Sequence, residues 1–250
     1  MNSDSAGAVP PQPLFHTNIV PISAERHGGL RLNSESGFGF CAGAATMPIG
    51  LAEFEPASTS YPILFTDATP AAPVVLLGMR EDWNLFVGET GAWTPGSYVP
   101  AIVRAFPFAI LGDGAGGRQV GFEADAACIS PTTGLPLFDN GQPTGVVHDA
   151  VAFCEAVETD LVAAAAFGTA LERAGILEPG EATIAVEGSA SARIAGYRTV
   201  DPARLATVPD NVFIEWRHKN WLPAVYAHLF SAARWVPFTE LAITQLNARR

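Results

Sequence analysis

The pattern of apolar residues changes character near the middle of the chain. Up to about residue 138, short apolar runs are separated by Gly and Pro, as is typical of strands bounded by turns. One run, Val74-Val75-Leu76-Leu77, does not alternate, which predicts a strand buried on both faces. A short helix is predicted from Ser97, which can cap it, to Ala105. The predicted strands cover about 18–22, 50–54, 62–66, 73–79, 84–87, 108–111 and 119–122.

After residue 139 the spacing of apolar residues becomes helical. Between about 144 and 174 they recur every three or four residues, and Gly175 provides a stop, so we predict one long helix. Glu178-Pro179-Gly180 predicts a turn. Asp201-Pro202 is an N-cap followed by proline, which predicts the start of a helical end. The remaining predictions are strands at about 182–186 and 192–197 with a hairpin at 188–191, and helices at about 202–207, 211–219, 222–233 and 237–248.

This order of elements predicts an α+β fold. We expect a flexible tail over residues 1–13 and a single domain over 14–250. That domain is expected to be β-rich over 14–138 and mainly helical over 139–250, with a long central helix, a β-hairpin and a helical C-terminal end.

Composition excludes several classes of function. The 250 residues carry a formal net charge of −11 and no dense Lys/Arg cluster, which argues against nucleic-acid binding. No apolar stretch approaches the ~18–20 residues of a membrane span. The first fifteen residues lack the basic and apolar regions of a signal peptide. Three widely spaced cysteines, Cys41, Cys128 and Cys154, fit a reducing compartment, so we expect a cytoplasmic location.

An ordered set of short motifs between about residues 20 and 234 resembles the SapC family, which is named for a gene linked to bacterial surface layers. The motifs are Tyr61-Pro62-Ile63-Leu64-Phe65, Leu76-Leu77-Gly78, Asn84-Leu85-Phe86, Trp93, Tyr98-Val99-Pro100-Ala101 with Arg104 and Phe106-Pro107-Phe108, Pro136-Leu137-Phe138-Asp139 with Gly141, Ala174-Gly175-Ile176-Leu177-Glu178, and Tyr226-Ala227-His228-Leu229 with Ser231.

The resemblance implies an accessory protein associated with surface layers. Proteins like it occur beside genes for flavin-dependent tryptophan-halogenase-like enzymes and outer-membrane transporters, but the resemblance brings no catalytic residues. The chain departs from the family where a second arginine often precedes the aromatic-Pro-Phe motif, because Ala105 stands there. Arg234-Trp235-Val236 also differs from the usual ending.

Arg104 is the cation that most needs an explanation, since it lies among aromatic residues and prolines. Its guanidinium can pair with a carboxylate and stack on Trp93 or Phe106, which would tie the framework together. The alternative is an anion clamp for the carboxylate or phosphate of a small substrate. In that enzyme hypothesis, Tyr98 or His27 is the acid–base group.

Other candidate binding residues are Asn84, in a family motif, and His228 and Trp216, in the helical end. His228 lies among apolar residues, where a core or interface histidine is the usual interpretation. Trp216 belongs to an aromatic set that is either a seam between helices or an exposed partner-binding patch beside Arg217, His218 and Lys219. The other members of that set are Phe213, Trp221, Tyr226, Phe230, Trp235 and Phe238.

The sequence favours a non-catalytic binding protein whose partner is a protein or a small molecule, and it leaves a homo-oligomer open. The five histidines have no metal-ligand spacing, so we expect no metal site. The glycine runs 37–40 and 112–117 lack the context of nucleotide-binding loops, so we expect no flavin or nicotinamide cofactor. The Gly188–Ser191 stretch is not a serine-hydrolase motif.

Overall fold

The computed structural model describes residues 13–34, 36–112, 117–184 and 192–248. These residues form a mixed α+β fold, as the sequence predicts. The chain divides into two compact units. Unit 1 consists of residues 1–36 and 105–155, and unit 2 of residues 37–104 and 156–250. All but the last residue of the tail predicted over 1–13, most of the glycine run 112–117 and the hairpin predicted at 188–191 lie outside the described residues. The single domain over 14–250 stays a prediction.

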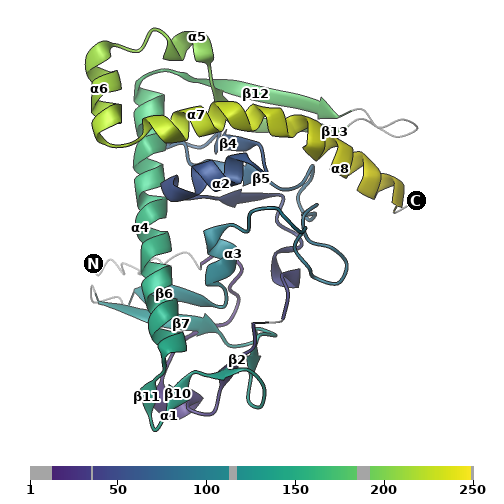
Figure 1. Cartoon of the computed structure of the whole chain (residues 1–250), viewed down its shortest axis with the longest axis vertical. Coiled ribbons are helices and arrows are strands. Elements are labelled where there is room, and N and C mark those ends of the chain that lie inside the picture. Colours follow the sequence, from purple (N-terminus) through teal and green to yellow (C-terminus); the bar gives the residue numbers. More distant parts are fainter. Residues whose placement is uncertain (1–12, 35, 113–116, 185–191, 249–250) are drawn as a thin grey trace, which may run out of the picture. The chain divides into compact units, whose positions relative to one another are not determined.

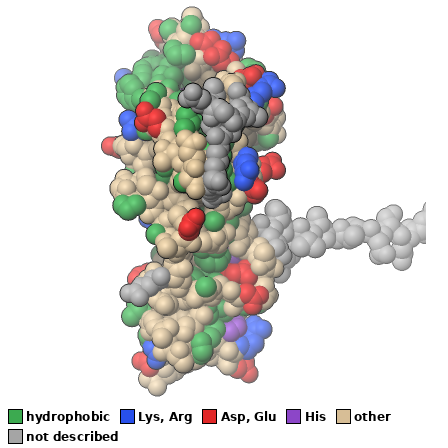
Figure 2. All heavy atoms as spheres, turned by 90° about the vertical axis from the view of Figure 1, so that its right-hand side faces the viewer, with side chains coloured by type: hydrophobic (Ala, Val, Ile, Leu, Met, Phe, Trp, Pro, Cys, Tyr) green, Lys and Arg blue, Asp and Glu red, His purple; other side chains and the backbone are tan. Residues whose placement is uncertain are grey.

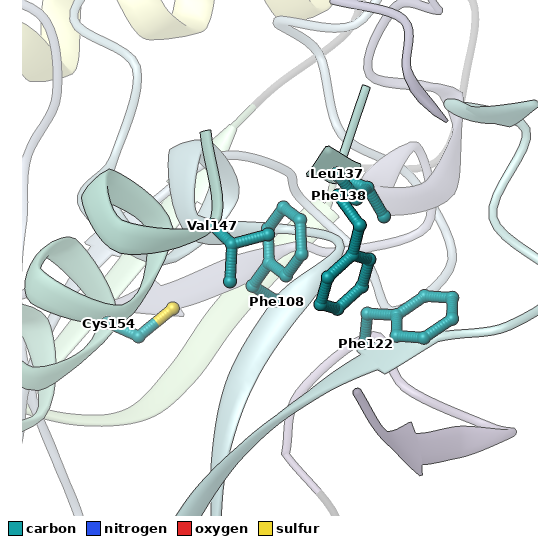
Figure 3. Close-up of a cluster of buried hydrophobic side chains, with 6 residues drawn as sticks. All are labelled: Phe108, Phe122, Leu137, Phe138, Val147 and Cys154. Carbon is teal, nitrogen blue, oxygen red and sulfur yellow. The ribbon is translucent and has the colours of Figure 1, made fainter. Parts of the chain in front are cut away.

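Unit 1 contains small antiparallel sheets in the orders β1-β7-β6 and β8-β2-β9, and a hairpin of β10 and β11. Its core, shown in Figure 3, joins Phe108 and Phe122 of the first sheet to Val147 and Cys154 of α4. The elements are β1 (Ile19–Pro21), α1 (Ala24–His27), β2 (Arg31–Leu32), β6 (Phe108–Gly112), β7 (Arg118–Glu123), β8 (Ile129–Ser130), β9 (Leu135–Pro136), β10 (Phe138–Asp139), β11 (Gln142–Pro143) and the start of α4 (Gly145–Arg173).

Unit 2 is built on an antiparallel sheet with the strand order β12-β13-β4-β5-β3. The helices α2 and α7 contact each other, and both contact β4 (Figure 1). Besides the rest of α4, the elements are η1 (Gly39–Cys41), β3 (Thr46–Pro48), η2 (Leu51–Glu53), α2 (Phe54–Ser58), β4 (Ile63–Thr66), β5 (Pro73–Leu76), α3 (Ala101–Ala105), β12 (Leu177–Ile184), β13 (Ala192–Val200), α5 (Pro202–Leu205), α6 (Asp210–His218), α7 (Leu222–Ser231), η3 (Ala232–Arg234) and α8 (Trp235–Ala248).

The strongest local signals are confirmed. The long helix is α4, and Gly175 follows it with φ +68°. The side chain of Asp201 caps α5 by accepting from the backbone N–H groups of Ala203 and Arg204. All four residues of β5 are buried, as expected for an inner strand without alternation. The remaining helices of the C-terminal end begin and end within about two residues of the predicted limits.

Three predictions of secondary structure between residues 50 and 105 are wrong. Residues 50–54 form η2 and the start of α2 rather than a strand, because the Glu53 carboxylate accepts from the Gly50 N–H and stabilises a helical turn. Residues 84–87 form no strand, because the Asn84 side chain binds the N–H of Phe86. The short helix begins at Ala101 and not at Ser97, since Pro100 disfavours helical geometry at the residue before it.

The predicted turn at Glu178-Pro179-Gly180 is also wrong, since these residues lie within β12. The chain turns earlier, at Gly175, where the N–H of Ile176 binds the carbonyl of Leu171. Because this C-terminal cap already reverses the chain, the strand can begin at Leu177. The glycine is instead used for packing, because a Cβ at position 180 would meet the ring of Tyr197 at 2.1 Å.

Candidate functional site

Arg104 lies at the end of α3 and holds its own segment together. Its Nε donates to the carbonyl of Val99 (3.1 Å), and one terminal nitrogen donates to the Tyr98 hydroxyl (3.1 Å). The guanidinium lies over the Tyr98 ring, 5.7 Å from its centroid. The structure therefore brings Arg104 together with Tyr98, the acid–base candidate of the enzyme hypothesis, in an arrangement that fixes the chain before α3.

The Tyr98 hydroxyl in turn donates to a buried carboxylate, Glu53 Oε1 (3.0 Å). The same oxygen accepts from the N–H of Ala101 (2.6 Å), and Oε2 accepts from the N–H of Gly50 (2.8 Å). Glu53 is only 5% exposed and joins η2 to the start of α3. The sequence interpretation missed this residue, although Gly50-Leu51-Ala52-Glu53 has the spacing of a capping box.

Trp93 belongs to the same network through Tyr61. The Trp93 indole donates to the Tyr61 hydroxyl (3.1 Å), which donates to the carbonyl of Tyr98. The N–H of Tyr98 donates to the Ser60 hydroxyl (3.0 Å). The N–H and the carbonyl of Tyr98 are thus both hydrogen-bonded to side chains from the segment between α2 and β4.

The environment of Tyr98 keeps its phenol protonated at neutral pH. Burial raises the pKa of Tyr98 to about 12, the Glu53 carboxylate adds to the rise, and Arg104 opposes it. A protonated phenol donates to Glu53 and accepts from Arg104, so both functions of its oxygen are in use. This arrangement is suited to holding a backbone turn, and it makes Tyr98 a weak candidate for a general base.

His27 and Asn84 make local contacts. The Nδ1 of His27, the last residue of α1, accepts from the N–H of Ser23 (3.1 Å), and its ring meets Phe122 edge-on. Burial and the neighbouring Arg26 lower the pKa of His27, which favours the neutral form. Asn84 is 1% exposed and uses both ends of its amide on the backbone of unit 2. These backbone contacts explain the positions of the His27 and Asn84 side chains.

His228 anchors α7 to the sheet. Its Nε2 accepts from the N–H of Val200 in β13 (3.0 Å), so the ring must be neutral there, with its proton on Nδ1. Nδ1 has no hydrogen-bond partner among the described residues. Burial lowers the pKa of His228 to about 4, with the backbone of Ile63 opposing. The family motif around His228 therefore contains a buried neutral histidine.

We predict that His228 makes unit 2 sensitive to acid. The unfolded histidine takes up a proton near pH 6.5, whereas the folded one does so only near pH 4. The free energy of unfolding should therefore fall by about 3 kcal/mol as pH drops from 6.5 to 4. Urea unfolding followed by tryptophan fluorescence over this range measures it. In His228→Gln the free energy of unfolding should depend less on pH than in the wild type, whereas His218→Gln, on the surface of α6, should keep the wild-type dependence. Equal pH dependence in all three proteins would contradict the prediction.

An apolar surface runs along α7 into α8. At its centre Phe230 is 72% exposed, and Tyr226 and Val236 are 43% and 65% exposed. We call this surface the apolar stripe. Figure 2 shows hydrophobic side chains gathered at the height at which Figure 1 places α7. The stripe consists of the exposed residues Pro223, Tyr226, Phe230, Ala233, Val236 and Pro237.

The predicted aromatic set is thus divided by the fold. Trp216, Trp221 and Phe238 are buried, as expected for a seam between helices. Tyr226 and Phe230 are exposed, as expected for a binding patch. Trp216 therefore belongs to the core, and a binding role for the exposed members stays a prediction.

A groove of about 540 Å³ lies between α4 and α6. The side of α4 contributes mostly small residues, while the side of α6 contributes aromatic and charged ones. We call it the α4–α6 groove. Its lining consists of Ala166, Thr169, Ala170, Arg173 and Ala174 of α4, Val212, Glu215 and Trp216 of α6, and Lys219 and Trp221 that follow.

Within the described ranges, no three His, Cys, Asp or Glu side chains gather closely enough to hold a metal ion. Among the same residues, no helix has both the length and the apolar character required to cross a membrane. Cys41, Cys128 and Cys154 form no disulfide bond with one another.

Comparison with protein-family models assigns most of the chain to one family. The SapC family model matches residues 22–237, which is most of the 250-residue chain. The chain belongs to the SapC family. Comparisons with curated proteins and with solved structures find no match. In this SapC protein, the family motifs quoted from the sequence include the Arg104–Tyr98 segment and the His228 anchor.

Proposed function

We propose that this SapC protein is a non-catalytic accessory protein that binds another protein through the apolar stripe of α7 and α8. The observation that carries the proposal is the exposure of Tyr226 and Phe230 on α7 and of Val236 near the start of α8. Large apolar side chains grouped on a surface mark interaction sites more often than singly exposed ones do.

The orientation of α7 explains why these side chains face outward. On its opposite side, Val225, His228 and Ser231 are buried. His228 accepts from the N–H of Val200, and the Ser231 hydroxyl accepts from the N–H of Ile63 in β4 (2.9 Å). Rotating α7 to bury Phe230 would break both contacts with the sheet. The exposure of the stripe is therefore fixed by buried polar contacts.

The chemistry of the stripe points to an amphipathic helix as the partner. From Asn220 to Ala233, which includes all of α7, the sequence contains no Asp, Glu, Lys or Arg, and the guanidinium of the next residue, Arg234, donates to the carbonyl of Thr59. An uncharged face therefore complements the α7 part of the stripe. On α7 the exposed positions 223, 226 and 230 are separated by three and four residues, the spacing by which helices interlock side chains. Tyr and other aromatic residues are enriched among residues that dominate binding energy. The family's link to surface layers makes a surface-layer-associated protein the first partner class to test.

Site-specific photo-crosslinking in the source cells tests the proposal. A photoreactive phenylalanine at position 230 should give one adduct with a different protein. The matched control is position 162, where Val162 on α4 is 66% exposed. Equal adducts from both positions, or an adduct only with a second copy of this chain, would contradict the proposal.

The partner identified in this way is then purified and its affinity measured. Phe230→Glu places a charge in the centre of the stripe, and we expect it to weaken binding about 100-fold. Val162→Glu adds the same charge at an exposed site outside the stripe and should leave the affinity within about twofold. An unchanged affinity for Phe230→Glu would refute the proposed surface.

A further inference from the structure

We propose that the α4–α6 groove binds a small monocarboxylate with an apolar body, and that Arg173 pairs with its carboxylate. This site is separate from the apolar stripe, and neither Arg104 nor Tyr98 takes part in it. The proposal rests on the volume of the groove, its charge and the chemistry of its walls.

The volume suits a small organic molecule. At about 540 Å³, the groove lies within the range of ~300–1,000 Å³ that is usual for ligand pockets. The room exists because α4 presents alanines, Ala166, Ala170 and Ala174, toward α6. A helix with larger side chains at these positions would fill the space.

The charge favours a single negative charge on the ligand. Lys219 and Glu215 form an ion pair at 2.6 Å, and the Lys219 ammonium lies 4.5 Å from the centre of the Trp221 ring. Arg173 is exposed, and its side chain makes no hydrogen bond or ion pair with any described residue. The Arg173 guanidinium can therefore pair with an anionic ligand, in a chain whose formal net charge is −11.

The shape of that cation favours a carboxylate. A guanidinium presents parallel N–H groups that match the two oxygens of a carboxylate. Val212 and the alanines provide apolar surface in the groove, beside the edges of the largely buried Trp216 and Trp221. A ligand with one carboxylate and an aromatic or aliphatic body uses both features, whereas a phosphate dianion would bring a second charge that has no matching cation.

Naphthalene-2-carboxylate is a suitable probe, and naphthalene-2-carboxamide is its neutral counterpart of the same shape. Isothermal titration calorimetry with the full chain should show saturable binding of the carboxylate, at least tenfold tighter than the amide. Arg173→Gln should weaken carboxylate binding about tenfold, to the level of the amide. Arg217→Gln removes the same charge from α6 outside the groove and should change neither affinity.

Ala170→Leu, which fills the groove, provides a second test and should weaken both probes. The proposal would be overturned if the carboxylate does not bind, if it binds no more tightly than the amide, or if Arg173→Gln leaves its affinity unchanged. Phe230→Glu should leave probe binding unchanged, so the groove and the apolar stripe can fail independently.

Discussion

Glu53→Ala should lower the free energy of unfolding of unit 2 by about 5 kcal/mol. The Glu53 carboxylate is 5% exposed and accepts from the N–H groups of Gly50 and Ala101 and from the Tyr98 hydroxyl. Alanine leaves these three donors without their acceptor, and each unsatisfied buried donor costs about 1–3 kcal/mol. The variant also removes the group that links η2 to α3.

Tryptophan fluorescence during urea unfolding is the appropriate measurement, since every tryptophan of the chain belongs to unit 2. The matched control is Glu55→Ala, because Glu55 is an exposed carboxylate two residues away on α2. We expect that control to change the free energy of unfolding by less than about 0.5 kcal/mol. Equal effects of the two variants would show that the Glu53 contacts contribute nothing specific. The tryptophans are Trp83, Trp93, Trp216, Trp221 and Trp235.

Gly168→Ala should lower the same free energy by about 4 kcal/mol, although alanine is the better helix former. A Cβ at position 168 would lie 2.0 Å from the carbonyl oxygen of Ala71, in the segment between β4 and β5. Because the obstacle is backbone, it cannot move aside as a flexible side chain would. Either α4 shifts away from this segment or the segment is displaced, and both disturb the packing around the buried Phe167.

Gly39→Ala is the control for this substitution. Gly39 is exposed, begins η1 in unit 2, and a Cβ there would meet no atom within 4 Å. The same urea titration should therefore give a change of less than about 1 kcal/mol. If Gly168→Ala is equally mild, α4 does not approach Ala71 as closely as the structure shows.

The elements with strong local signals could be predicted from the sequence. The α4 helix has buried residues at helical spacing, such as Ala164, Phe167 and Leu171, and Gly175 ends it. The Asp201 cap depends only on its near neighbours. Such features need no knowledge of the rest of the chain.

The site depended on contacts that no local pattern contains. Glu53 and Tyr98 are 45 residues apart, so nothing near Arg104 indicated that a buried carboxylate lies at the end of its hydrogen-bond chain. Predicting a strand over 50–54 hid Glu53 further, because its side chain turns the backbone there into a helix.

The apolar stripe shows the same limit. The segment 222–233 is apolar on nearly all sides, so periodicity could not say which face is buried. The choice is made by His228 and Ser231, which bind backbone groups of β13 and β4. The exposure of Phe230 is a consequence of these long-range contacts, and it could only be seen in the folded chain.

The most direct test of the proposed function compares the affinity of the purified partner for three proteins: the wild type, Arg104→Met and Phe230→Glu. If Arg104 holds the framework and the stripe binds the partner, Arg104→Met should bind within about twofold of the wild type, and Phe230→Glu about 100-fold more weakly. The reverse result, with binding lost in Arg104→Met and kept in Phe230→Glu, would contradict it and make Arg104 the binding residue.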